Sequence, residues 1–259
     1  MNRSPFHLVE LSPWPVTSSI SALCLTLGLV SWFHGYSVLI LLMSFFMMIL
    51  SMYQWWRDIS REGVFKGAHM HKVVSGLSMG MILFITYEVW FFITFFWAYF
   101  HMSYQPATEL GAKWPPIGMD ILNPFSIPLL NTAVLLASGM TITWAHHSMI
   151  NKDKFNFSLA LSMTIMLGLY FTILQLSEYN LASFSISDSV YGTTFYVTTG
   201  FHGAHVLIGT MFLVTCFLRS LSQQYSSNHH FGFMAAAWYW HFVDVIWICL
   251  FTSMYWWGS

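Results

Sequence analysis

The chain has 259 residues, of which 56% are apolar and only 7% are charged, and its formal net charge is −1 at pH 7. Because soluble domains carry about 25% charged residues, these side chains are too few to cover a water-soluble globule. Composition therefore excludes a soluble enzyme, a nucleic-acid-binding protein and a disordered chain, and it indicates a polytopic membrane protein.

Seven stretches are long and apolar enough to cross a bilayer, which takes about 20 residues. No Asp, Glu, Lys or Arg occurs between Leu11 and Trp56, and the segment His34-Gly35-Tyr36-Ser37 divides this region into two spans. The third span contains one charged residue, Glu88, and Pro128 suits the first turn of the fourth. The predicted spans cover residues 16–34, 38–56, 73–104, 128–148, 155–179, 191–218 and 233–257.

The distribution of basic residues supports this number of spans. Of the nine Lys and Arg residues, seven spans place only Lys113 on the side opposite the N-terminus. Loops that face the cytoplasm or matrix carry such an excess, so we expect the N-terminus to face inward and the C-terminus outward. The connection 57–72 holds four of the basic residues and forms a positive patch suited to anionic lipid headgroups, with an ordinary solvated loop as the alternative.

Glu88 lies near the middle of the third span, where a charged carboxylate costs at least about 2.5–3.5 kcal/mol. Its neighbours one helical turn away are all apolar, namely Phe84, Ile85, Phe91 and Phe92. Two interpretations remain open. Glu88 takes up protons, gates a pathway or binds a polar ligand, or it is a neutral carboxyl bonded to another helix or to a lipid headgroup.

The sixth and seventh spans carry two polar pairs, His202-x-x-His205 and His241-x-x-Asp244. Each pair lies on one helix face, and four such groups could ligate a metal. Hydrogen bonds between membrane helices explain the same residues, and we favour that interpretation. Phosphate-binding, dinucleotide-binding and nucleophile-elbow motifs are missing, so we predict no catalytic residue and no metal ligand on this chain.

Long segments of the chain resemble subunit III of cytochrome c oxidase, in its animal mitochondrial form. The matching segments run from residue 12 to the end and include Trp55-Trp56-Arg57-Asp58, LLNTAVLLASGMTITWAHHS (129–148), TTGFHGAHVLIGT (198–210) and AAAWYWHFVDVIW (235–247). One departure is visible, because Met234 stands where the family commonly has an acidic residue. A required role for a carboxylate at that position is therefore doubtful in this chain.

The resemblance implies an all-α membrane protein with seven transmembrane helices. Residues 1–72 would form an N-terminal segment with two helices and the inner basic loop, and residues 73–259 a five-helix bundle, with a V-shaped lipid cleft between helices 1–2 and helices 3–7. The implied location is the mitochondrial inner membrane, with the N-terminus in the matrix and the C-terminus toward the intermembrane space.

The implied function is that of a non-redox core subunit of the oxidase, which reduces O2 to water with electrons from cytochrome c and pumps protons. The chain would carry no cofactor of its own, with haem and copper on partner subunits, and would dock chiefly on subunit I and contact other oxidase subunits. It would bind phospholipids, support proton uptake and stabilise the catalytic subunit. The alternatives are an independent transporter or channel that uses Glu88, and a metal-bearing subunit that uses the four polar residues of spans six and seven.

The family's buried carboxylate aligns with Glu88, which we expect to be mostly protonated. The implied lipid-binding positions are Trp56, Arg61, His69, Glu88 and Arg219. We expect phosphate headgroups to pair with Arg61 and Arg219, and acyl chains to lie among Phe84, Phe91 and Phe92.

Overall fold

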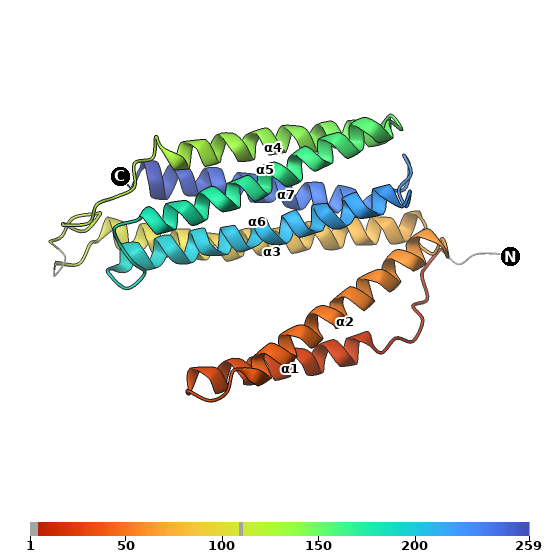
Figure 1. Cartoon of the computed structure of the whole chain (residues 1–259), viewed down its shortest axis with the longest axis horizontal. Helices are drawn as coiled ribbons and strands as arrows, with labels where there is room; N and C mark the ends of the chain where they lie inside the picture. The colour runs from red at the N-terminus through yellow and green to blue at the C-terminus, as the bar shows by residue number, and fades with distance from the viewer. Residues whose placement is uncertain (1–4, 109–110, 259) are drawn as a thin grey trace. The chain divides into compact units, whose positions relative to one another are not determined.

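The computed structural model describes residues 5–108 and 111–258. Within these residues the chain forms seven α-helices followed by a π-helical turn, without a β-strand (Figure 1). The helices are α1 (Trp14–Phe33), α2 (Leu39–Val64), α3 (His71–Tyr104), α4 (Ile127–Ile150), α5 (Lys154–Leu181), α6 (Val190–Leu221) and α7 (Phe231–Leu250), and the turn is η2 (Phe251–Trp256). All seven helices are long and apolar enough to cross a membrane, with η2 extending the last, which confirms the predicted all-α fold.

The clearest difference from the predicted spans is at the end of α2. The apolar stretch ends at Trp56, but the helix continues to Val64. Hydropathy marks where the apolar segment stops, whereas a helix stops where its backbone hydrogen bonds stop, and neither Gly nor Pro interrupts residues 57–62. The last two turns of α2 therefore carry polar side chains beyond the apolar stretch.

The structure divides into a first unit up to Leu77 and a second unit from Ser78. In the first unit, α1 and α2 form a helical hairpin. Their buried positions are all small: Ser21 and Gly28 on α1, and Ser44 and Ser51 on α2. A Cβ atom added to Gly28 would lie 2.7 Å from the Cα of Leu41. Small residues thus allow the two backbones to approach closely, as is common between membrane helices.

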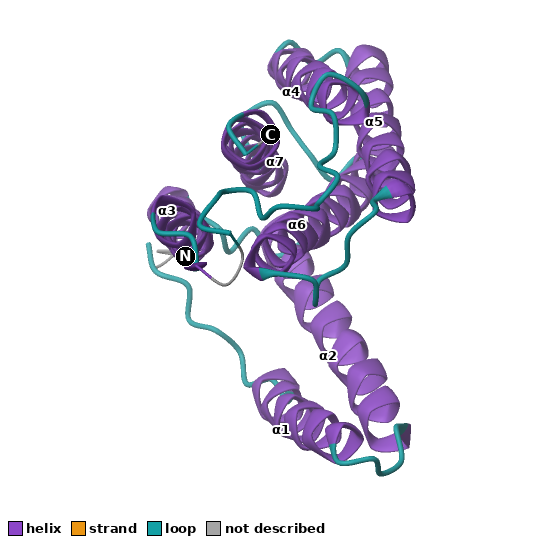
Figure 2. Cartoon of the chain, turned by 90° about the vertical axis from the view of Figure 1, so that its left-hand side faces the viewer, coloured by secondary structure: helices purple, strands orange, loops and turns teal. Residues whose placement is uncertain are grey.

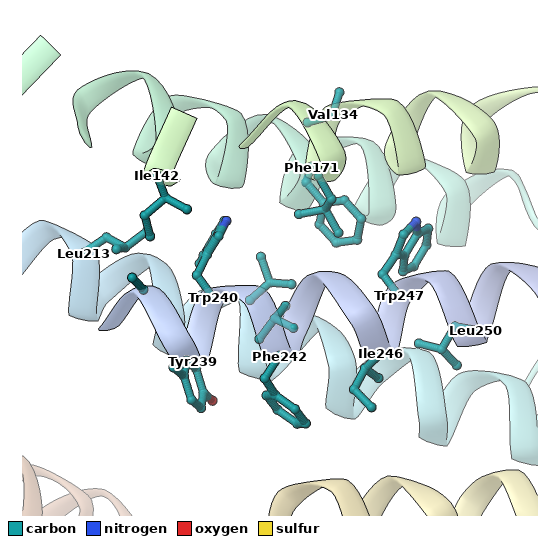
Figure 3. Close-up of a cluster of buried hydrophobic side chains, with 14 of the residues drawn as sticks. Val134, Ile142, Phe171, Leu213, Tyr239, Trp240, Phe242, Ile246, Trp247 and Leu250 are labelled. Atoms are coloured by element: carbon teal, nitrogen blue, oxygen red, sulfur yellow. The ribbon is translucent and has the colours of Figure 1, made fainter. Parts of the chain in front are cut away.

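In the second unit, α7 lies among α3, α4 and α6, and α5 packs against α4 and α6 (Figure 2). The side chains of α7 meet those of α4, α5 and α6 in a continuous apolar core (Figure 3). Trp240 at its centre is fully buried, and its Nε1 donates a hydrogen bond to the Ser138 Oγ at 2.8 Å. Gly168 and Gly209 make room for its indole ring, because a Cβ at either would come within 3.0 Å of it. The position of α7 is thus fixed by one large ring, Trp240, that fits against two glycines on neighbouring helices.

Candidate functional site

Glu88 on α3 forms a hydrogen bond with His205 on α6. The Glu88 Oε2 lies 2.9 Å from the His205 Nε2, and the two side chains are only 13% and 11% exposed. The His205 Nδ1 lies 2.6 Å from the carbonyl oxygen of Phe201, which can only accept. Nδ1 therefore carries a hydrogen, and the contact with Glu88 requires one proton between Nε2 and Oε2. The pair thus has no net charge, whichever partner holds that proton.

Aromatic rings surround this pair. The rings of Phe92 and Tyr239 lie 5.1 Å and 6.3 Å from the His205 ring, and Phe91 lies at 6.2 Å. Phe92 is fully buried and also contacts Phe242. The expectation that Phe92 contacts acyl chains is therefore wrong, because α3 turns this side chain into the bundle. A hydrogen-bonded pair without net charge costs less in such an apolar environment than a lone charged or unpaired polar group.

The two polar pairs of α6 and α7 behave differently from each other. The His202 Nε2 donates to the carbonyl oxygen of Val243 on α7 at 3.2 Å, so His202 bonds between helices. The His241 Nδ1 lies 3.8 Å from the Asp244 Oδ2, and both residues belong to α7. Asp244 faces α4, where a Cβ at Gly139 would come within 2.8 Å of its Oδ2.

The structure does not gather these four residues into one group of ligands. Across residues 5–108 and 111–258, the one group of three or more possible metal ligands with all its ligand atoms within 4.8 Å of one another consists of His7, Glu62 and His69.

Another buried carboxylate, Glu178 on α5, was not predicted from the sequence. Its side chain is 1% exposed, and the Tyr255 hydroxyl of η2 donates to its Oε1 at 2.5 Å. Gln175 lies 3.5 Å from the same hydroxyl, and Asn131 on α4 donates to Gln175 at 3.4 Å. The polar spacing of Gln175 and Glu178 on one face of an apolar helix was the available signal. Glu178 lies one residue before the predicted end of the fifth span, where a charged residue is expected to face the membrane interface.

The first unit contains three of the expected lipid-binding residues, near the end of α2. Trp56 is 61% exposed and the Arg61 side chain is 59% exposed. The Arg61 guanidinium lies 3.9 Å from the Asp58 carboxylate, which also accepts a hydrogen bond from the Trp14 Nε1 at 2.7 Å. His69 lies a few residues beyond the helix, with its ring centroid 5.9 Å from that of His7. An exposed cation and an exposed indole thus lie in the last turns of this helix.

An ion pair and a hydrogen bond hold the N-terminal segment against the end of α2. The Lys66 Nζ lies 2.7 Å from the Glu10 Oε2, and the His7 Nε2 lies 3.0 Å from the Glu62 Oε2. The hydrogen bond from Lys66 and its positive charge lower the pKa of the Glu10 carboxyl. The same hydrogen bond raises the pKa of Lys66.

The two remaining positions at which we expect lipid binding, Glu88 and Arg219, belong to the second unit. Arg219 lies in the last turn of α6, where its Nε donates to the Gln224 side chain at 3.1 Å and its guanidinium lies 4.8 Å from the centre of the Tyr225 ring. These contacts orient a cation at the end of a spanning helix, where a phosphate group is a suitable partner.

A family model described as "Cytochrome c oxidase subunit III" matches residues 4–259. The chain belongs to this family. Similar proteins include a "Cytochrome c oxidase subunit 3" from Lumbricus terrestris, 61% identical over the full length of both chains, and one from Heterololigo bleekeri, 58% identical over the same extent. Another from Drosophila yakuba is 59% identical over 100% of this chain and 98% of its own length.

These matches confirm the family expected from the sequence. The chain is a subunit of cytochrome c oxidase, an oxidoreductase complex, and a multi-pass protein of the mitochondrial inner membrane. Membership of this family argues against the alternative that the chain is an independent transporter or channel.

Proposed function

We propose that this chain is a non-redox subunit that binds phospholipids at the basic end of its spanning helices and stabilises the catalytic subunit beside it. That neighbour is subunit I, with haem and copper on partner subunits. The observation that carries the lipid-binding role is that Trp56 and Arg61, both in the last turns of α2, have exposed side chains. A guanidinium pairs with phosphate while an indole sits at headgroup level.

The role in proton uptake rests on the charge distribution. The basic residues cluster on the side that we expect to face the matrix, so we propose that the N-terminus lies in the matrix and the C-terminus toward the intermembrane space. In this orientation Arg61, His69 and Arg219 lie on the side from which the oxidase takes up protons. Lipid bound there would exclude water from paths other than the one that supplies the enzyme. The V-shaped lipid cleft stays a prediction.

The Glu88–His205 pair has a supporting role in this proposal. It joins α3 to α6 without a net charge in the membrane, and so helps to keep the bundle rigid. The pair acts as an interhelical bond and not as part of a transport pathway.

The test compares intact oxidase with wild-type chain, Arg61→Ala, Arg219→Ala and the control Lys113→Ala. We expect either test variant to lose bound phospholipid, measured by mass spectrometry of the purified complex, and to shorten the working lifetime of the enzyme during turnover. The initial rate of electron transfer should stay close to wild type, and Lys113→Ala should change none of the three. An early loss of electron transfer with the lipid still bound would contradict the proposal.

A further inference from the structure

Three possible metal ligands converge in the first unit, and only one of them, His69, is among the expected lipid-binding positions. One ligand atom from each of His7, Glu62 and His69 lies within 4.8 Å of the other two. The His7 Nε2 and the Glu62 Oε2 are 3.0 Å apart, and the two imidazole rings meet edge to face at 5.9 Å. All three residues are half-buried, so the group is partly shielded from water yet accessible to a small ion.

The backbone brings these residues together from three segments. Extension of α2 to Val64 places Glu62 in its last turn. Gly67, with a φ of 62°, then turns the chain back, and the Ala68 N–H donates to the Glu62 carbonyl oxygen at 3.1 Å. This returns His69 onto Gly63, where a Cβ would come within 2.7 Å of the His69 Nδ1.

Contacts outside the trio hold the N-terminal segment in place. Lys66 pairs with Glu10, three residues after His7, and the Trp14 indole donates to Asp58 on α2. These two contacts fix the chain that follows His7, so the position of His7 does not rest on its contact with Glu62 alone. A site whose ligands are held by other contacts needs little rearrangement to bind an ion.

We propose that His7, Glu62 and His69 bind a divalent transition-metal ion, with Zn²⁺ the best match. Two imidazoles and one carboxylate form a known ligand set for zinc, and such sites keep a fourth position for water. Imidazole nitrogen selects against Mg²⁺ and Ca²⁺, which prefer sites built from oxygen alone. Binding would fasten the N-terminal segment to the end of α2, so the ion would act as a clamp and not as a redox centre.

The test uses the full chain in phospholipid nanodiscs and, in parallel, the intact oxidase. Zn²⁺ affinity is measured by competition with a chromophoric chelator for wild type, His7→Ala, Glu62→Gln and His69→Ala. We expect about one Zn²⁺ per chain and at least a tenfold loss of affinity in each variant, which is the scale on which single changes at metal sites act. The matched control is His71→Ala, an exposed histidine two residues beyond the site.

Four further measurements keep the result decisive. X-ray absorption at the zinc edge should show two imidazole nitrogens with the remaining ligands oxygen, and excess Mg²⁺ or Ca²⁺ should not displace the ion. Far-ultraviolet circular dichroism should show unchanged helix content in His7→Ala, since His7 lies outside every helix. That variant should also keep its phospholipid, which separates this site from the lipid-binding role. Failure to bind Zn²⁺, equal affinity in all variants, or sulfur ligation would overturn the proposal.

Discussion

The Glu88–His205 contact gives the sharpest test of how this bundle tolerates a carboxylate inside the membrane. Replacing either residue alone by Leu leaves the other polar group buried among aromatic rings without its partner, while the double variant removes both groups together. A buried polar group left unpaired costs about 1–3 kcal/mol, so each single variant should lose that much stability. The double variant should lose clearly less than the sum, because neither polar group then remains.

The size of the difference reports the charge state of the pair. One hydrogen bond of 2.9 Å between neutral partners predicts a coupling free energy of about 0.6–2 kcal/mol. Breaking a buried ion pair would cost about 3–5 kcal/mol. Because we expect Glu88 to be mostly protonated, we expect the lower range.

The assay is unfolding of the full chain from mixed micelles by a denaturing detergent, followed by circular dichroism. Glu88→Gln serves as the control, because its amide can still donate to the His205 Nε2 and should keep most of the stability. Infrared spectra should lose a protonated-carboxyl band in this variant. A coupling indistinguishable from zero would show that the contact does not form in the membrane, and an ionised carboxylate at Glu88 at neutral pH would refute the neutral-acid interpretation.

Three other changes test the packing and the helix ends. Gly168→Ala should destabilise the bundle by about 1–3 kcal/mol through overpacking against an indole; in the same unfolding assay Gly203→Ala, whose Cβ meets nothing within 4 Å, should not. Tyr255→Phe should cost about 1–3 kcal/mol because Glu178 loses its donor, and an unchanged unfolding midpoint would argue against that bond. Asp153 caps α5, and hydrogen bonds from the first turn lower the pKa of its carboxyl. The cap is therefore fully present above about pH 4 and is lost as pH falls through the lowered pKa. Amide protection at the start of α5, measured relative to the intrinsic exchange rate at each pH, should fall over this range; Asp153→Ala is the control, because its protection should not change there.

The number and order of the helices follow from local sequence, because a spanning helix needs only a long apolar stretch. The same local signal fails at the end of α2. Residues 57–64 lie beyond the apolar stretch but continue the helix, so the predicted end was eight residues early.

Hydrogen-bond partners on different helices could not be predicted from the local sequence. Glu88 and His205 are 117 residues apart, and nothing in either helix specifies which face turns toward the other. The same holds for Glu178, whose donor Tyr255 lies 77 residues later on a π-helical turn that periodicity does not indicate. Both contacts depend on the rotation of whole helices, which is set by packing around rings such as Trp240 and not by local pattern.

The seam of serine and glycine between α1 and α2 has a consequence for which mutations this hairpin can accept. Its large apolar side chains, such as Ile20, Leu23 and Leu27, point away from the seam, so exchanging one for another leaves the contact between the backbones unaltered. Even a single methyl group at Gly28 would push the two helices apart. We therefore expect substitutions at the seam to be limited by side-chain volume, and substitutions elsewhere in the hairpin only by hydrophobicity. The smallest residues of the hairpin are then the ones that can least be replaced.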